Sequence, residues 1–156
     1  MLCANLNSLP FDYVTRQKTQ STNLNWYIVE QLPVIAPGDY DRRFGAKTAA
    51  EIVRDDVLAL SYTAHDMEPF ARDMGHDGPP FAWDEADRAS RRARLDALYF
   101  HLYGVVEPDD VRYIFSTFPI VEREDTERWG RYLSRDLCLA WINALAAGDP
   151  DADIRL

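Results

Sequence analysis

The chain has 156 residues, the length of one domain, and 47% of them are hydrophobic, which is enough apolar side chain to bury a core. Its formal net charge of −9 argues against a surface that binds nucleic acid over its whole extent, because such proteins carry a net basic face. No apolar run approaches the roughly 18 residues that a membrane helix needs, which leaves a membrane role without support.

The charge is distributed unevenly along the chain. Residues 1–48 contain five cations and four anions, whereas residues 49–156 contain 12 cations and 22 anions. A polyanion would therefore meet the first third of the chain, and the remainder would repel it.

The first third is predicted to begin with an amphipathic helix over residues 2–17, in which Pro10 marks a kink or a late start. Its apolar side chains recur at helical spacing: Leu2, Leu6, Leu9 and Tyr13. A helical turn is expected at residues 26–31, followed by a short edge strand at residues 32–35. The minor β element of the fold is therefore placed near residues 22–36.

Helix signals are stronger beyond residue 44. Thr48-Ala49-Ala50-Glu51 is a capping box that opens a helix over residues 48–65, and a short helix follows at 66–74. Asp84 caps a helix that runs to Tyr103 and stops at Gly104. Two further helices are predicted, one from Pro108 to Phe118 and one over residues 134–147.

These elements predict a mostly α fold, α+β only through the minor β element, built as a single helical domain over residues 1–156. Within it, residues 1–45 form a recognition-like segment that would face DNA, and residues 46–148 form a helical subdomain. The polar residues 149–156 are expected to be a frayed tail.

Motifs for catalysis and metal binding are missing from the sequence. A nucleotide or methyl-donor site needs a glycine-rich turn between a strand and a helix, and the seven glycines form none. Histidines and cysteines do not occur at metal-ligand spacing. We therefore expect no enzyme activity, no cofactor and no metal. The arginine run of residues 88–94 alternates with acidic neighbours, which favours a solvated helix face with ion pairs over a phosphate track.

Cys3 and Cys138 lie far apart, and no basic and apolar secretory leader precedes them. A cytoplasmic protein with reduced thiols is therefore expected.

One cluster of cationic and amide side chains suits a nucleic acid. It comprises Arg16, Gln17, Lys18, Gln20, Asn23 and Asn25. Arginine and lysine reach phosphates, whereas asparagine and glutamine can read base edges bidentately. The residues alone leave an ordinary polar loop with two cations as the alternative.

Five blocks of the sequence, in order, resemble the C-terminal target-recognition region of large adenine-specific DNA methyltransferases of restriction-modification and phage-defence systems. The blocks are NLNSLPFDYVTRQK, NLNWYIVEQLPVIAP, LSYTAHDMEPFARDMGHDGPPFAWDE, LDALYFHLYG and DDVRYIFSTFPIVERED. In that family an upstream Rossmann-like domain handles the methyl donor and the target adenine. Where relatives have small or glycine residues after the Arg-Gln-Lys block, this chain has Thr19-Gln20-Ser21.

The resemblance implies DNA recognition without catalysis, by what looks like the detached tail of a longer enzyme. Its candidate contacts are Arg16, Gln17, Lys18, Asn23 and Asn25. An alternative of a different class is a helical interaction module that binds a methyltransferase partner or itself without touching DNA. A homo-oligomer through the N-terminal segment is also expected, since apolar side chains crowd that end: Leu2, Leu6, Phe11, Trp26, Tyr27 and Ile28.

Overall fold

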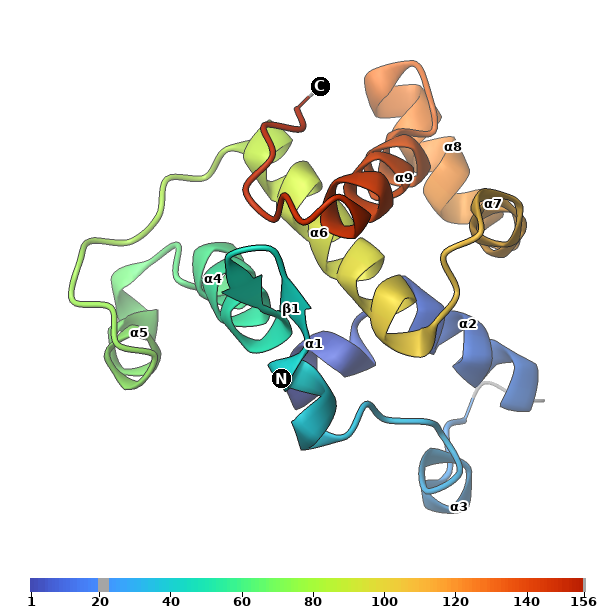
Figure 1. Cartoon of the computed structure of the whole chain (residues 1–156), viewed down its shortest axis with the longest axis horizontal. Coiled ribbons are helices and arrows are strands. Elements are labelled where there is room, and N and C mark those ends of the chain that lie inside the picture. The colour runs from blue at the N-terminus through green and yellow to red at the C-terminus, as the bar shows by residue number, and fades with distance from the viewer. Residues whose placement is uncertain (20–22, 156) are drawn as a thin grey trace.

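Helix α6, Glu85–Tyr103, runs through the middle of the molecule, and helices from both ends of the chain pack around it (Figure 1). The computed structural model describes residues 1–19 and 23–155, and their architecture is the predicted single, mostly helical domain. The ends of α6 form as the sequence predicts. The side chain of Asp84 accepts a hydrogen bond from the Asp87 amide at 2.9 Å, and Gly104 closes the helix with φ +75°.

The core lies mainly between α6 and α9, Leu133–Ala146, with α4, Ala49–Ser61, on another side of α6. The predicted capping box at the start of α4 is present: Thr48 Oγ1 accepts from the Glu51 amide, and Glu51 accepts from the Thr48 amide. The largest fully buried side chains include three aromatic residues of this core: Tyr99, Phe100 and Phe115.

The β element is a two-stranded antiparallel hairpin of β1, Arg43–Phe44, and β2, Lys47–Thr48, with Arg43 opposite Thr48. Gly45 in its turn has φ +61°, and a Cβ at this position would lie 1.9 Å from the carbonyl oxygen of Gly148. Only glycine fits there, because the close approach joins the hairpin to the end of α9.

The prediction of a strand near residues 22–36 is wrong. The described part of that range contains α3, Trp26–Val29, and then irregular chain as far as the 3₁₀-helix η1, Pro37–Asp41. Side chains, and not a neighbouring strand, form hydrogen bonds with this backbone. Asn5 Oδ1 accepts from the Ile35 amide at 2.9 Å, and the Tyr103 hydroxyl donates to the Pro33 carbonyl at 2.7 Å.

The helix predicted over residues 2–17 is two helices, α1, Leu2–Leu6, and α2, Leu9–Lys18, so Pro10 marks a late start. Ser8 precedes α2, but its hydroxyl donates to the Asn5 carbonyl and does not cap the helix. Asp96 of α6 caps the start of α2 in place of Ser8, because the Asp96 carboxylate accepts a 2.7 Å hydrogen bond from the Leu9 amide.

The segment between α4 and α6 contains the 3₁₀-helix η2, His65–Met67, and α5, Glu68–Asp73. Its return to α6 packs on Tyr62, whose carbonyl accepts from the Phe81 amide at 2.8 Å. The ring of His76 stacks on that of Phe81 with centroids 5.0 Å apart.

Helix α7, Pro108–Ser116, matches its prediction, whereas α8, Pro119–Trp129, was not predicted. The sequence of α8 has a weak apolar face, and the helix buries none of its residues fully. It forms against α9, and the Asp125 carboxylate accepts from the Ser134 amide at the start of that helix.

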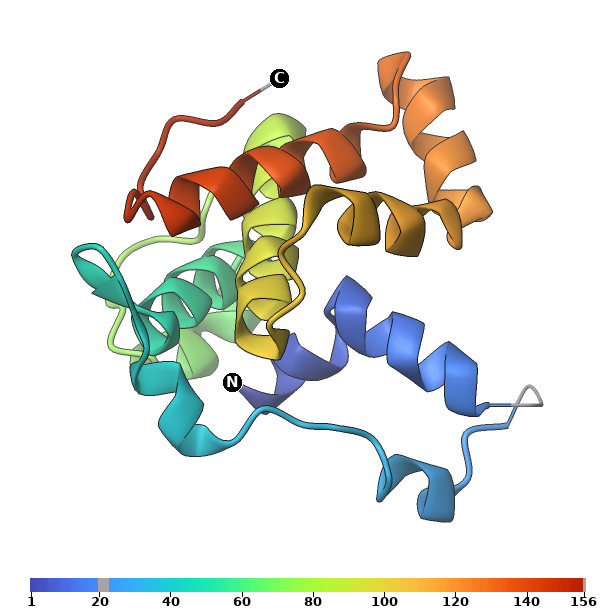
Figure 2. The ribbon, with the colours of Figure 1, turned by 45° about the vertical axis from the view of Figure 1, so that its right-hand side comes forward.

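The prediction of a frayed tail is wrong for residues 149–155. This segment turns back after α9 toward α6 (Figure 2). Arg94 donates to the Pro150 carbonyl at 2.7 Å, and the Ser90 hydroxyl donates to the Ile154 carbonyl at 2.6 Å. These bonds from α6, together with the packing of Ala152 and Ile154 on the core, fix the tail in place. Leu156 lies outside the described residues.

In the part of the chain that the structure describes, no helix combines the length and the apolar character needed to cross a bilayer.

Candidate nucleic-acid interface

The end of α2 and the start of α3 lie next to each other at one edge of the molecule in both views (Figure 1, Figure 2). We call this region, residues 16–19 and 23–27, the α2–α3 edge. It contains all five candidate contacts predicted from the sequence. Gln20, the sixth residue of the cationic and amide cluster, lies outside the described residues, as does Ser21.

Arg16 and Lys18 lie in the last turn of α2, where cations complement the negative end of the helix dipole. The helix ends at Thr19, whose backbone is extended and whose hydroxyl donates to the Thr15 carbonyl at 2.9 Å. The helix dipole thus explains why cations occur at this position without reference to a ligand.

Arg16 is already paired within the fold. Its Nε and Nη2 donate to the two carboxylate oxygens of Asp12 at 2.9 and 3.0 Å. Its guanidinium also lies 4.6 Å from the centroid of the Phe118 ring. The hydrogen bond to Asp12 raises the pKa of Arg16, so this side chain stays charged. A phosphate would have to compete with Asp12 for it.

Gln17 and Lys18 are exposed, and within the described chain the side chain of neither forms a hydrogen bond or an ion pair. The other cations of the first third differ. Arg42 donates to the His101 carbonyl, Arg43 to the Ala46 carbonyl, and Lys47 bonds to carboxylates. Among the described residues of this third, Lys18 is therefore the cation that remains open to a phosphate.

Asn25 precedes α3, and its backbone carbonyl accepts from the Ile28 amide at 2.9 Å. Its side chain makes no capping bond and is exposed, which leaves the amide available to a ligand. Asn23 is also exposed, but it already takes part in an interaction. The edge therefore combines one available cation with two available amides, those of Gln17 and Asn25.

Two aromatic side chains were not among the predicted contacts. Trp26 is 74% exposed and Tyr27 is 62% exposed, whereas the following residue, Ile28, is buried. The sequence analysis placed both in the apolar group expected to drive self-association, and not in a nucleic-acid contact.

The cluster of Asn5 and Tyr103 positions the segment after α3. Asn5 is fully buried, and its amide nitrogen donates to the Tyr103 hydroxyl at 2.7 Å. Because the two side chains also bind the backbone at Pro33 and Ile35, they join α1, α6 and this segment. We call the hydrogen bonds of Asn5 and Tyr103 with each other and with the backbone of Pro33 and Ile35 the Asn5 clasp.

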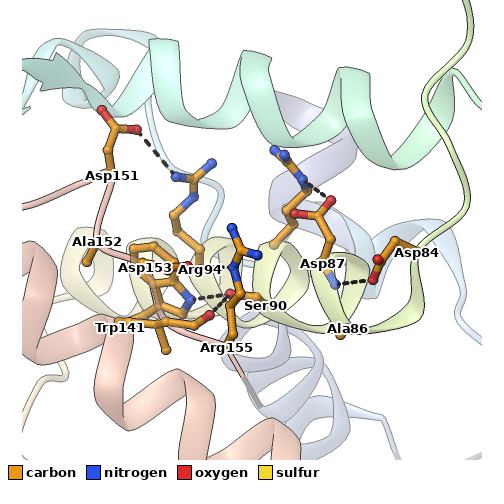
Figure 3. A pocket seen from close by; sticks show the side chains of 12 residues that line it. Asp84, Ala86, Asp87, Ser90, Arg94, Trp141, Asp151, Ala152, Asp153 and Arg155 are labelled. Carbon is orange, nitrogen blue, oxygen red and sulfur yellow. Dashed lines mark hydrogen bonds and ion pairs between the residues drawn. The ribbon is translucent and has the colours of Figure 1, made fainter.

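A separate pocket of about 360 Å³ lies between the start of α6 and the C-terminal tail (Figure 3). Three arginines line it, but each is paired with an aspartate: Arg91 with Asp87, Arg94 with Asp56 and Asp151, and Arg155 with Asp153. The ion pairs predicted at residues 88–94 are present for Arg91 and Arg94, but the face is not solvated throughout, because Arg94 is buried against Asp56 of α4. This arrangement leaves no unpaired guanidinium for an anion.

Within the described residues, no group of three or more histidine, cysteine or carboxylate side chains is placed to hold a metal ion. Comparisons with protein-family models, with curated proteins and with solved structures found no match for this chain.

Proposed function

We propose that this chain is a non-catalytic DNA target-recognition module, resembling the C-terminal part of an adenine-specific DNA methyltransferase. It would act in the cytoplasm beside a methyltransferase domain that supplies the methyl donor and the chemistry. The observation that carries the proposal is the α2–α3 edge, where Gln17, Lys18 and Asn25 all present exposed polar side chains without partners inside the fold.

The chemistry of these side chains suits a DNA strand. Lysine neutralises a phosphate, and the amides of Gln17 and Asn25 can each form the paired hydrogen bonds that adenine offers in the major groove. Arg16 adds a second phosphate contact when it leaves Asp12. That exchange costs little, since exposed ion pairs contribute only about 0–1 kcal/mol.

The acidic remainder of the chain limits where DNA can bind and how tightly. Residues 49–156 contain ten more anions than cations, so they repel a polyanion and direct it to this edge. One or two phosphate contacts give weak binding, so a methyltransferase domain supplies most of the affinity in this proposal.

A salt-dependent titration of a mixed-sequence DNA duplex tests the proposal, with and without a methyltransferase partner. Lys18→Ala should weaken binding and reduce the magnitude of the salt slope by about one, the value for one lost phosphate contact. Arg54→Ala is the matched control, because Arg54 is an exposed, unpaired cation on α4. Equal effects of the two substitutions, or no binding by the wild type in either setting, would contradict the proposal.

The proposal assigns no methyl transfer to this chain alone. Incorporation of labelled methyl groups into DNA by the purified chain, above the level of a boiled control, would show that the assignment is wrong.

A second candidate function, a protein-interaction module, has its own supporting observation on α1. Leu2 and Leu6 lie one turn apart on this helix and are 57% and 42% exposed. Phe11 and Ile28 are buried, so they cannot contribute to the expected self-association without rearrangement. Sedimentation over a concentration series tests this candidate: a wild-type dimer that Leu2→Ser with Leu6→Ser converts to monomer supports it, and a wild-type monomer at high concentration opposes it.

A further inference from the structure

The most exposed aromatic pair of the described chain, Trp26 and Tyr27, has no role in the fold that accounts for its position. Both side chains face solvent in α3, while Ile28 and Leu32 of the same segment are buried. Contiguous apolar surface left open in a folded chain commonly marks a binding site.

We propose that Trp26 and Tyr27 form a stacking surface for unstacked DNA bases, so that the α2–α3 edge binds single-stranded or locally opened DNA in preference to intact duplex. The inference rests on the proposed DNA-recognition function, and it adds the form of DNA that the edge takes.

Hydrogen bonds on the C-terminal side of Trp26 and Tyr27 hold the backbone of the segment that carries the aromatic rings. The side-chain Nε2 of Gln31 donates to the Tyr27 carbonyl at 3.0 Å at the end of α3. A few residues further on, the Asn5 clasp fixes Pro33 and Ile35 to α1 and α6. A surface held in this way loses little conformational freedom when a base stacks on it.

The composition of the edge favours DNA over a second protein as the occupant. Next to the aromatic pair lie a cation and two amides, Lys18, Gln17 and Asn25, which are the groups that bind phosphates and base edges. The buried centre of a protein interface is instead depleted in charge, and lysine is disfavoured there.

The small number of available cations favours bases over the phosphate backbone as the main source of affinity. Intact duplex offers its phosphates and groove edges, and only Lys18 of the described edge is an unpaired cation. Single strands also expose base faces, and stacking of one base on an aromatic side chain is worth about five- to 150-fold in affinity. Two such side chains therefore outweigh the contribution of one phosphate contact.

The test compares a labelled single strand with the duplex of the same sequence at one low salt concentration. The wild type should bind the single strand more tightly. Trp26→Ala and Tyr27→Ala should each weaken that binding by roughly tenfold, with a smaller effect on duplex, whereas Trp26→Phe should retain most of it. Tyr113→Ala is the matched control, because Tyr113 on α7 is 64% exposed and lies outside the edge.

The outcomes separate this inference from the proposed function. Duplex binding that depends on Lys18 but not on Trp26 or Tyr27 retains the DNA-recognition proposal and overturns the stacking surface. Failure of the wild type to bind either form of DNA overturns both. Loss of self-association in the aromatic variants, with unchanged binding of the single strand, would identify the pair as a protein interface and would also overturn the inference.

Discussion

Arg94 and Arg16 each place a guanidinium against an aspartate, but in opposite surroundings. Arg94 on α6 faces Asp56 on α4, and their side chains are 9% and 0% exposed. Arg16 and Asp12 lie one turn apart on α2, and theirs are 57% and 45% exposed. Arg94 also donates to the Pro150 carbonyl, so the buried pair connects two helices and the C-terminal tail.

The difference between the two pairs separates structure from function. A buried pair is costly to break, because the partner left behind is an uncompensated charge away from water. An exposed pair contributes about 0–1 kcal/mol and exchanges partners easily. Arg94 is therefore a fixed part of the fold, whereas Arg16 can exchange Asp12 for another anion at little cost.

Breaking the buried pair should give the largest effect. Asp56→Asn leaves the charges of Arg94 and Arg91 without their shared carboxylate and should lower the free energy of unfolding by about 3–5 kcal/mol. Urea denaturation measures this loss. Replacing both partners, with Asp56→Leu and Arg94→Met, should recover part of it, because no buried charge remains. A loss below about 1 kcal/mol for Asp56→Asn would mean that the pair is not the structural element described above.

The pH dependence that Asp96 gives to stability should be intermediate in size. Asp96 is a carboxylate of α6 whose hydrogen-bond donor is the Leu9 backbone amide and not an arginine. Burial raises the pKa of Asp96 to about 7, opposed by the hydrogen bond from the Leu9 amide and by the charge of Arg92. The folded chain then binds more protons than the unfolded chain between about pH 4 and 7. Its contribution to stability is therefore present below about pH 4 and is lost as the pH rises to 7.

Asp96→Asn tests this pH dependence, since the asparagine oxygen can still accept from the Leu9 amide but does not ionise. The wild type should lose about 2 kcal/mol more free energy of unfolding than the variant between about pH 4 and 7. The loss is no larger because two pockets beside the carboxyl moderate its burial. The difference between wild type and variant, measured by urea denaturation against pH, isolates Asp96 from the charged residues that line one of these pockets with it: Asp12, Arg92, Glu124, Asp125 and Arg128. Parallel pH curves for the two proteins would contradict the assignment.

Breaking the exposed pair should give the smallest effect on stability. Asp12→Asn should change the free energy of unfolding by less than about 1 kcal/mol, because both side chains are already hydrated. Thermal and urea denaturation of this variant, beside those of Asp56→Asn, compare the two pairs directly. A loss as large as that of Asp56→Asn would show that Arg16 is as much a part of the structure as Arg94.

The predicted helices that proved correct have local signals at their ends. Thr48 and Glu51 identify the start of α4, and Asp84 and Gly104 identify both ends of α6. Such signals act within a few residues, so they can be recognised without knowing the tertiary structure.

The errors occur where distant contacts decide the structure. The segment at residues 32–35 has the composition of a strand, but Asn5 and Tyr103 bind its backbone, and the hairpin forms at residues 43–48 instead. Helix α8 was not predicted because its sequence is polar with a weak apolar face, and the helix forms against α9. The tail was predicted to fray because its bonds come from Ser90 and Arg94 on α6.

The candidate site was predicted in part. Its cations and amides were identified by type, and the pairing of Arg16 could have been recognised from Asp12 four residues earlier on the same helix. Trp26 and Tyr27 were predicted only as part of an apolar group that drives self-association. The sequence did not distinguish these two exposed side chains from Phe11 and Ile28, which are buried.

The most direct test of the central claim, that the α2–α3 edge meets DNA, is the salt dependence of duplex binding by Asp12→Asn. Freeing Arg16 should tighten binding and increase the magnitude of the salt slope by up to about one. Asp66→Asn, which removes an exposed carboxylate on η2, is the control for the change in net charge and should leave the slope unchanged. Equal affinities of Asp12→Asn and Asp66→Asn for the duplex at every salt concentration would contradict the claim that this edge contacts DNA.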